Sequence, residues 1–355
     1  MVRYSLAFSL IASCFTTALQ CSAVRAISSS TSMSALPEVG ELFEETGFYQ
    51  SIRLFDEPPL FTKQSAFQRI EVVRSPYYGK VLVLDGVLQL TERDANAYNE
   101  MMAHLPMFQH RLPKRVLVIG GGDGYVLSEV LKHESVLSVD HVDLDVEVIE
   151  TCRKFFSWGD AWKDPRVTLH IADGAEFVRN APTGYYDVIV QDSSDPWGWD
   201  ESGNMVELPS KVLYAREHFE NLYRILGQDG ILNIQAETLQ IPSDFAGATE
   251  WRQTLLDVGF SSSRYGSILI SSYPTGQIGF LMSEKNPDVS TSPRDIQQRF
   301  TALKMVGKPT SYYHPRLQVG AFDLPYWAEQ QMYGDETIKS VCDNPSHQHD
   351  EIADQ

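Results

Sequence analysis

Acidic residues follow four apolar segments of this chain, at the points where β-strands are expected to end. They are Asp123, Asp143 with Asp145, Asp173, and Asp192 with Asp195. In an open α/β sheet, ligands bind outside the carboxyl ends of the strands, so acids placed there converge on one cleft. A single acid at such a position often caps the next helix. Four groups in succession, one of them inside a glycine loop, favour a binding site rich in carboxylates.

The glycine loop comes directly after the apolar residues 116–119 and comprises residues 120–124. A buried strand that runs into glycines and then into a helix is typical of the cofactor loop of doubly wound sheets, with Gly120 and Gly122 against the ligand. The dinucleotide pattern would need glycine at position 125, where the chain has Tyr125. The carboxylate of Asp123 would also repel a pyrophosphate. The loop therefore disfavours NAD and favours a nucleoside ligand.

The other acids are suited to the rest of that nucleoside. Asp143 lies about 20 residues after the glycines, where a carboxylate accepts hydrogen bonds from ribose hydroxyls, and Asp173 is placed to accept one from an adenine amino group. Asp123 and Asp192 would attract an ammonium group and repel a carboxylate, at a cost on the order of 4 kcal/mol for the like-charge contact. These residues point to S-adenosylmethionine as co-substrate, and to its decarboxylated form in particular.

The elements that must position these acids follow an α/β pattern. Short strands are expected between about 47 and 89, including 68–74 and 80–86, and a helix over 94–110. The alternation that follows predicts strands over 115–120, 138–144, 167–171, 187–191 and 230–236, and helices over 125–133, 146–155, 211–226 and 245–258. Segments 263–271 and 276–283 can form an antiparallel edge hairpin. The fold class is therefore α/β, with a small antiparallel β domain before a Rossmann-like domain.

The chain is expected to divide into four parts. They are a targeting or disordered leader (1–35), an N-terminal β-strand domain (40–100), a Rossmann-like domain (101–332) and a disordered acidic tail (333–355). In the leader, the apolar run from Leu6 to Leu19 is short for a membrane span, and small residues follow it. A secretory signal, a two-part plastid address and a disordered leader with an internal start at Met33 all remain open. We expect the mature protein to lie outside the membrane.

Composition argues against several classes of function. The 355 residues carry a net charge of −18, which disfavours a nucleic-acid partner because phosphate backbones select basic surfaces. The four cysteines include no closely spaced pair that would form a metal site, and the nine histidines form no ligand pattern. We therefore expect no disulfide framework, no metal and no prosthetic group.

Five stretches of the sequence together resemble one known family. They are Tyr77–Gly86, Thr91–Asp94, Gly120–Gly124, Asp192–Pro196 and Tyr273–Phe280. In order and in spacing, from about Gly47 to Met332, they look like the spermidine synthases, which are aminopropyltransferases. The resemblance implies an S-adenosylmethionine-methyltransferase-like Rossmann fold behind a small N-terminal β domain. It also implies a homodimer or homotetramer, and the cytoplasm as the family's usual compartment.

The resemblance further implies roles for the matching residues. Asp192 would be the catalytic base, with Tyr98 orienting it or the attacking nitrogen. The residues implied for the nucleoside co-substrate are Gln68, Gly120, Gly122, Asp123, Asp143, Asp173 and Gly174. The residues implied for the amine are Asn99, Asp195, Gln235, Glu237 and Tyr273. Outside this context, Tyr98 and Tyr273 would each be interpreted as core packing.

The chain also departs from the family pattern. Asp143 stands where the family usually has Glu, and Asn99 where it has Gln or His; Ala236 replaces a Gly, and Phe55 replaces a Trp. The loop over 196–210 is about ten residues longer than usual, and loops of this length at a site often act as lids. It could reshape the amine channel, or be an insertion without a role in the site.

The reaction implied by these residues is transfer of an aminopropyl group from decarboxylated S-adenosylmethionine to putrescine, giving spermidine and 5′-methylthioadenosine. The long loop keeps a different acceptor open, as in a spermine synthase. A methyltransferase that uses S-adenosylmethionine is disfavoured by Asp123. The substitutions at Asp143 and Asn99 keep open an inactive, polyamine-binding relative.

Overall fold

The computed structural model describes residues 37–43, 46–156, 158, 160–199, 205–289 and 291–334. The leader predicted over 1–35 lies outside these residues, and so does the predicted acidic tail from residue 335 onward. All described residues belong to one compact unit of the chain. In this part of the chain, no helix combines the length and the apolar character that crossing a membrane requires.

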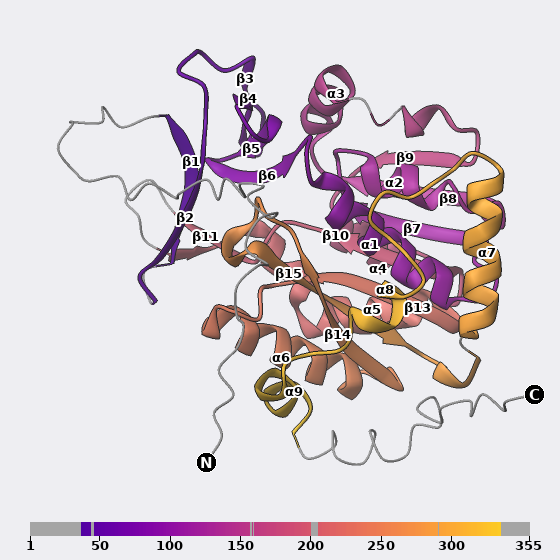
Figure 1. Cartoon of the computed structure of the whole chain (residues 1–355). Coiled ribbons are helices and arrows are strands. Elements are labelled where there is room, and N and C mark those ends of the chain that lie inside the picture. Colours follow the sequence, from indigo (N-terminus) through magenta and orange to yellow (C-terminus); the bar gives the residue numbers. More distant parts are fainter. Residues whose placement is uncertain are drawn as a thin grey trace, which may run out of the picture. The chain divides into compact units, whose positions relative to one another are not determined.

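A mixed sheet of seven strands forms the centre of the fold, in the order β14-β15-β13-β10-β7-β8-β9 (Figure 1). Its strands are β7 (Arg115–Gly120), β8 (Ser138–Asp143), β9 (Val167–Ile171), β10 (Tyr186–Asp192), β13 (Leu226–Ala236), β14 (Ser262–Leu269) and β15 (Gln277–Glu284). The first five are parallel, and β15 and β14 add an antiparallel edge. The predicted Rossmann-like sheet with its edge hairpin is confirmed. The strand order reverses between β7 and β10, where open α/β sheets bind ligands.

Helices cover both faces of this sheet. They are α1 (Ala95–Gln109), α2 (Tyr125–Val130), α3 (Val146–Phe155), α4 (Gly174–Asn180), α5 (Arg216–Ile225), α6 (Pro242–Asp257), α7 (Pro293–Met305), α8 (Leu317–Gly320) and α9 (Tyr326–Tyr333). Successive side chains of β7 lie on opposite faces of the sheet. Val116 and Val118 share an apolar cluster with α1, α2 and α7, whereas Leu117 and Ile119 share one with α5, α6 and α9. A strand buried on both faces reads as a continuous apolar run, which is why β7 could be predicted.

Two antiparallel elements precede the main sheet. The first is the hairpin of β1 (Glu38–Phe43) and β2 (Phe48–Arg53). The second is a four-stranded sheet of β3 (Phe61–Gln64), β4 (Arg69–Ser75), β5 (Gly79–Leu84) and β6 (Val87–Thr91). Ile70, Val72 and Leu82 of this small sheet share an apolar core with Val148 and Cys152 of α3. Val81 and Val83 of the same sheet pack in a second apolar cluster with Ile52 of the hairpin, so the small sheet is stabilised by both of its neighbours.

The structure differs from the sequence prediction in several places. The helix expected over 211–226 is broken, because Ala215 is extended (φ −77°, ψ 150°) between a 3₁₀ segment, Pro209–Tyr214, and α5. The long loop contains a hairpin of β11 (Trp197–Trp199) and β12 (Met205–Glu207), and α4 and α7 to α9 were not predicted.

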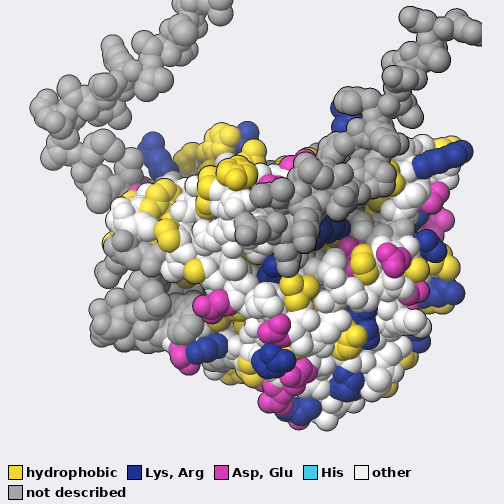
Figure 2. Space-filling model, turned by 90° about the horizontal axis from the view of Figure 1, so that it is seen from below, with side chains coloured by type: hydrophobic (Ala, Val, Ile, Leu, Met, Phe, Trp, Pro, Cys, Tyr) yellow, Lys and Arg dark blue, Asp and Glu magenta, His cyan; other side chains and the backbone are white. Residues whose placement is uncertain are grey.

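On the face in Figure 2, positive and negative side chains are interspersed rather than gathered in patches.

Candidate active site

The glycine loop brings the ends of three strands into contact. Gly120 has a φ of 73°, and a methyl group on it would lie 2.0 Å from the carbonyl oxygen of Asp192. The backbone N–H of Gly121 donates to that same oxygen at 2.9 Å. A methyl group on Gly122 would lie 2.7 Å from the carboxylate of Asp143. Only glycine permits these approaches, and they gather the carboxylates at the ends of β7, β8 and β10.

Asp192 ends β10 and accepts a hydrogen bond from the Tyr98 hydroxyl of α1, at 2.7 Å to Oδ1. Burial raises the pKa of Asp192 to about 6, while the Tyr98 hydrogen bond lowers it. The Tyr98 ring is buried beside Tyr273 and Phe280, with centroids 5.9 Å and 5.5 Å away. Core packing therefore holds Tyr98 in the orientation that reaches Asp192, so the packing and functional interpretations of this residue are compatible.

Asp123 and Asp143 lie in the same cluster. The Asp123 carboxylate accepts from the N–H of Tyr125 at 2.7 Å, at the start of α2, and that of Asp143 accepts from the N–H of Asp145 at 2.8 Å. Burial, and then the charges of Asp192 and Asp143, raise the pKa of Asp123 to about 8. Burial likewise raises the pKa of Asp143 to about 7, with contributions from Asp145 and Asp192.

These three carboxylates repel one another. Among the described residues, none of Asp123, Asp143 and Asp192 forms an ion pair with Lys, Arg or His. A buried charge without a partner is costly, and its pKa shifts toward the neutral form instead. A cationic ligand would supply the missing positive charge and return the carboxylates to their ionised state.

Two further acids are helix caps: Asp145, which follows β8, and Asp173, which follows β9. Asp145 caps α3 through the N–H of Glu147 at 3.0 Å, and also accepts from Ser65 at 2.6 Å and Gln68 at 3.1 Å. Asp173 caps α4, with Oδ1 accepting from the N–H of residues 175 and 176. Its Oδ2 accepts no hydrogen bond from the described residues. The bond to Asp145 brings Gln68, in the turn between β3 and β4, close to the end of β8.

Gly174 is explained by packing. A methyl group on it would lie 2.7 Å from Cγ2 of Ile119, so α4 can begin this close to β7 only with glycine at this position. The neighbouring cap, Asp173, is thereby held beside the end of β7. The predicted nucleoside residues thus lie along three neighbouring strand ends, and their contacts with a nucleoside stay a prediction.

Several of the residues predicted for the amine lie near the ends of β10 and β13. Gln235 at the end of β13 donates to Asp195 at 3.1 Å and accepts from the Tyr214 hydroxyl at 2.9 Å. Burial, and then the charges of Asp195 and Asp244, hold the pKa of Glu237 well above its usual range. Tyr214 was missed in the sequence, because the helix predicted over 211–226 gave it no special place.

Tyr273 and Asn99 have different surroundings. The Tyr273 hydroxyl donates to the carbonyl of Gln89 at 2.7 Å, which links the small sheet to the loop before β15. Asn99 donates from Nδ2 to the carbonyl of Ala95 within α1, at 2.8 Å. Its Oδ1 is buried and meets no partner among the described residues. The structure does not bring Asn99 into contact with the acids, so its role in amine binding stays a prediction.

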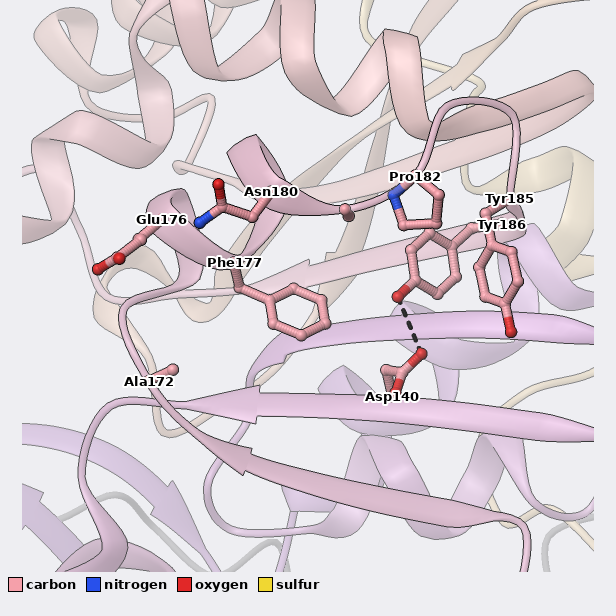
Figure 3. A pocket seen from close by; sticks show the side chains of 9 residues that line it. Asp140, Ala172, Glu176, Phe177, Asn180, Pro182, Tyr185 and Tyr186 are labelled. Carbon is pink, nitrogen blue, oxygen red and sulfur yellow. Dashed lines mark hydrogen bonds between the residues drawn. The ribbon is translucent and has the colours of Figure 1, made fainter.

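A separate cavity of about 620 Å³ lies beside α4 (Figure 3). Asp140 of β8 lines it and accepts from the Tyr186 hydroxyl at 2.9 Å, while His170 lies 2.8 Å from its other oxygen. None of the predicted site residues lines this cavity. Both oxygens of Asp140 therefore have partners within the fold.

Comparisons with known proteins show the family of this chain. A family model described as the spermine/spermidine synthase domain matches residues 95–293, and one described as the spermidine synthase tetramerisation domain matches residues 57–92. Spermidine synthase 1 of Hyoscyamus niger is 38% identical over 277 residues, which are 77% of this chain and 84% of that protein. Spermine synthase of Arabidopsis thaliana is also 38% identical, over 281 residues, 78% of this chain and 74% of that protein.

Among solved structures, the fold is similar to that of a spermidine synthase in complex with the transition state analogue AdoDATO. The TM-score is 0.73 and the identity 30%, over 83% of this chain and 94% of that one. The chain therefore belongs to the spermidine/spermine synthase family.

Proposed function

We propose that this protein transfers the aminopropyl group of decarboxylated S-adenosylmethionine to putrescine, giving spermidine and 5′-methylthioadenosine. One observation carries the proposal. Asp192 is held by Tyr98 beside Asp123, in a cluster of carboxylates without a basic partner among the described residues. Such a cluster suits a reaction in which both substrates are cations. The likeness to spermidine synthases supports this choice of substrates.

In the proposed reaction, a primary amine nitrogen attacks the carbon next to the sulfonium. The N–C bond forms as the S–C bond breaks, the electrons of the broken bond go to sulfur, and neutral methylthioadenosine leaves. The sulfonium is already a good leaving group, so the protein mainly contributes orientation and an unprotonated nucleophile. Tyr98 serves this by fixing the carboxylate of Asp192 that faces the nitrogen.

Asp192 takes the proton that the nitrogen loses. An alkylammonium has a pKa near 10, so a carboxylate cannot deprotonate it fully before reaction. As the N–C bond forms, the nitrogen becomes acidic, and Asp192 can accept its proton. Burial helps because it raises the pKa of Asp192 to about 6, which makes this carboxylate a stronger base than an exposed one.

Asp123 would bind the ammonium of the aminopropyl group. The same carboxylate would repel the amino-acid carboxylate of ordinary S-adenosylmethionine. A methyltransferase is therefore the less favoured of the two candidate functions. Asp143 and Asp173 would hold the ribose and adenine, and Asp195, Gln235, Glu237 and Tyr273 the far end of the amine. The match to a tetramerisation domain supports a homo-oligomer, for which we propose a tetramer. Light scattering on the purified chain would test its mass.

The acceptor is the least constrained part of the proposal. Relatives at the same identity include spermidine synthases and a spermine synthase, and the loop with β11 and β12 follows Asp195 directly. A panel of amines supplied with decarboxylated S-adenosylmethionine tests the choice. Formation of spermidine and methylthioadenosine in equal amounts from putrescine is expected. If other amines are turned over and putrescine is not, the acceptor is one of those amines and not putrescine. No turnover with any amine would overturn the proposed function.

A further inference from the structure

The N-terminal hairpin of β1 and β2 contacts the loop before β15, which carries Tyr273, a residue predicted for the amine. The side-chain amide of Gln50 donates to the carbonyl of Tyr273 at 2.7 Å and to that of Ser271 at 3.4 Å. The sequence analysis assigned no residue of this hairpin to the site. These bonds attach the hairpin to the loop that carries Tyr273, whose ring packs on Tyr98.

Glu41 is on the face of the hairpin that makes this contact. It pairs directly with Gln50 in the antiparallel register, and side chains of directly opposed residues lie on the same face of a sheet. Glu41 is half-buried, whereas its neighbours Gly40 and Leu42 are exposed. The hairpin therefore turns Glu41 toward the body of the protein, beside the Tyr273 loop.

The electrostatic surroundings of Glu41 agree with this placement. After burial, the charges that raise its pKa most are those of Asp195 and Asp244, and the pKa reaches about 7. Asp195 and Asp244 also raise the pKa of Glu237. Glu41 is thus within electrostatic reach of Asp195, one of the residues predicted for the amine. None of the described residues forms a hydrogen bond or an ion pair with the Glu41 carboxylate.

The number of carboxylates exceeds what a diamine can neutralise. When one nitrogen of putrescine reacts beside Asp192, only one ammonium is left for the far end. Asp195 and Glu237 already provide two carboxylates for that ammonium. A linear triamine would bring a second ammonium to this end, and it would relieve the repulsion that Glu41 contributes.

Resting on the proposed function, we propose that Glu41 binds an additional ammonium of longer acceptors, so that the enzyme also aminopropylates a linear triamine. The chemistry is unchanged: the N–C bond forms, the S–C bond breaks, the proton goes to Asp192, and methylthioadenosine leaves. Glu41 touches no reacting atom and acts as a specificity-determining residue. Its effect falls on the binding of the triamine rather than on the rate of the bond-forming step.

The test compares Glu41→Gln with the full-length wild-type chain, using putrescine and spermidine as acceptors. Glu38→Gln is the matched control, since Glu38 is on the same strand but on the exposed face, where it bonds Tyr49 and Ser51. For Glu41→Gln we expect a tenfold or larger fall in kcat/KM for spermidine, mainly through KM, with kcat/KM for putrescine changed less than threefold. Glu41→Asp, which keeps the charge, should retain most of the activity on spermidine.

The outcomes separate the two proposals. Turnover of putrescine without any turnover of spermidine by the wild type would overturn the role of Glu41 and leave the proposed function standing. An equal fall for both amines, or the same fall in Glu38→Gln, would also overturn it, because the hairpin would then act only as a structural support. Absence of turnover with every amine would overturn the proposed function, and the role of Glu41 with it.

Discussion

Two groups of buried ionisable side chains lie beside the first strand of the main sheet, and only one contains its own counter-ions. Glu129 of α2 is buried, with Lys132 at 2.6 Å and His104 at 3.0 Å. His104 in turn lies 2.9 Å from His133. The second group, by contrast, consists of Asp123, Asp143 and Asp192, which are neighbours of one another. None of these three forms an ion pair with a Lys, Arg or His of the described residues.

The difference separates a structural cluster from a binding cluster. A buried acid with a cation and hydrogen bonds is satisfied within the fold, and the loss of one partner costs stability. A buried acid without a cation lowers the stability of the free protein and makes it respond to a cationic ligand. Changes in the cleft should therefore alter binding and catalysis, while changes around Glu129 should alter stability.

Asp192→Asn should have the largest effect on the reaction. Removal of a positioned proton acceptor typically costs 10²- to 10⁴-fold in rate, and we expect kcat to fall by about that factor. Binding of methylthioadenosine, which carries no ammonium, should stay within about threefold of the wild type, as measured by calorimetry. A variant with nearly wild-type kcat would show that another group accepts the proton.

Asp123→Asn should weaken the co-substrate next. Loss of a charge-assisted hydrogen bond costs about 1.5–3 kcal/mol, so the Kd of decarboxylated S-adenosylmethionine should rise roughly 10- to 150-fold. With a pKa of about 8, Asp123 is mostly protonated at pH 7 in the free protein, and an ammonium ligand should expel that proton. Calorimetry in two buffers of different ionisation enthalpy measures the release. If Asp123→Asn releases the same number of protons on binding, the proton comes from another residue.

These two variants also bear on what could be predicted from the sequence. The strands β7 and β9 have the predicted bounds, because buried parallel strands are continuous apolar runs ended by turn residues. The carboxylates at the strand ends could be predicted for the same reason. Their distant partners could not, because Asp145 also accepts hydrogen bonds from Ser65 and Gln68, about 80 residues away in the chain.

Other parts of the site depend on contacts that leave no local pattern. Tyr214 reaches Gln235 only because Ala215 breaks the predicted helix. The hairpin that carries Glu41 is placed beside Tyr273 by the bond from Gln50, its partner in the hairpin register. Periodicity reports which face of an element is buried, and it does not report which distant element covers that face.

Glu129→Gln should act on the satisfied cluster instead. The substitution keeps the shape of the side chain and removes its charge beside Lys132 and His104, so the free energy of unfolding should fall by about 2 kcal/mol. The kcat at 25 °C should be unchanged, since no site residue contacts this cluster in the described structure. Urea unfolding measures the first quantity and steady-state turnover the second. A loss of kcat at full stability would remove the distinction between the two clusters.

Tyr98→Phe should have the smallest effect of these changes. Its hydroxyl lowers the pKa of Asp192, so its removal should raise that pKa further above its usual range. Asp192 must be deprotonated to accept a proton, so activity rises with pH through its pKa. The acid limb of kcat/KM should therefore move to higher pH, and activity should fall more at pH 6 than at pH 8. If the acid limb of kcat/KM does not move, a group other than Asp192 is responsible for it.

The central claim is that the carboxylates of the cleft are reserved for a cationic tail, and the most direct measurement is calorimetry of two nucleosides on the same protein. Decarboxylated S-adenosylmethionine and S-adenosylmethionine differ only by the carboxylate that Asp123 and Asp192 would repel. A like-charge contact of about 4 kcal/mol predicts that the decarboxylated form binds tighter by at least two orders of magnitude. Equal binding, or tighter binding of the carboxylated form, would contradict the account.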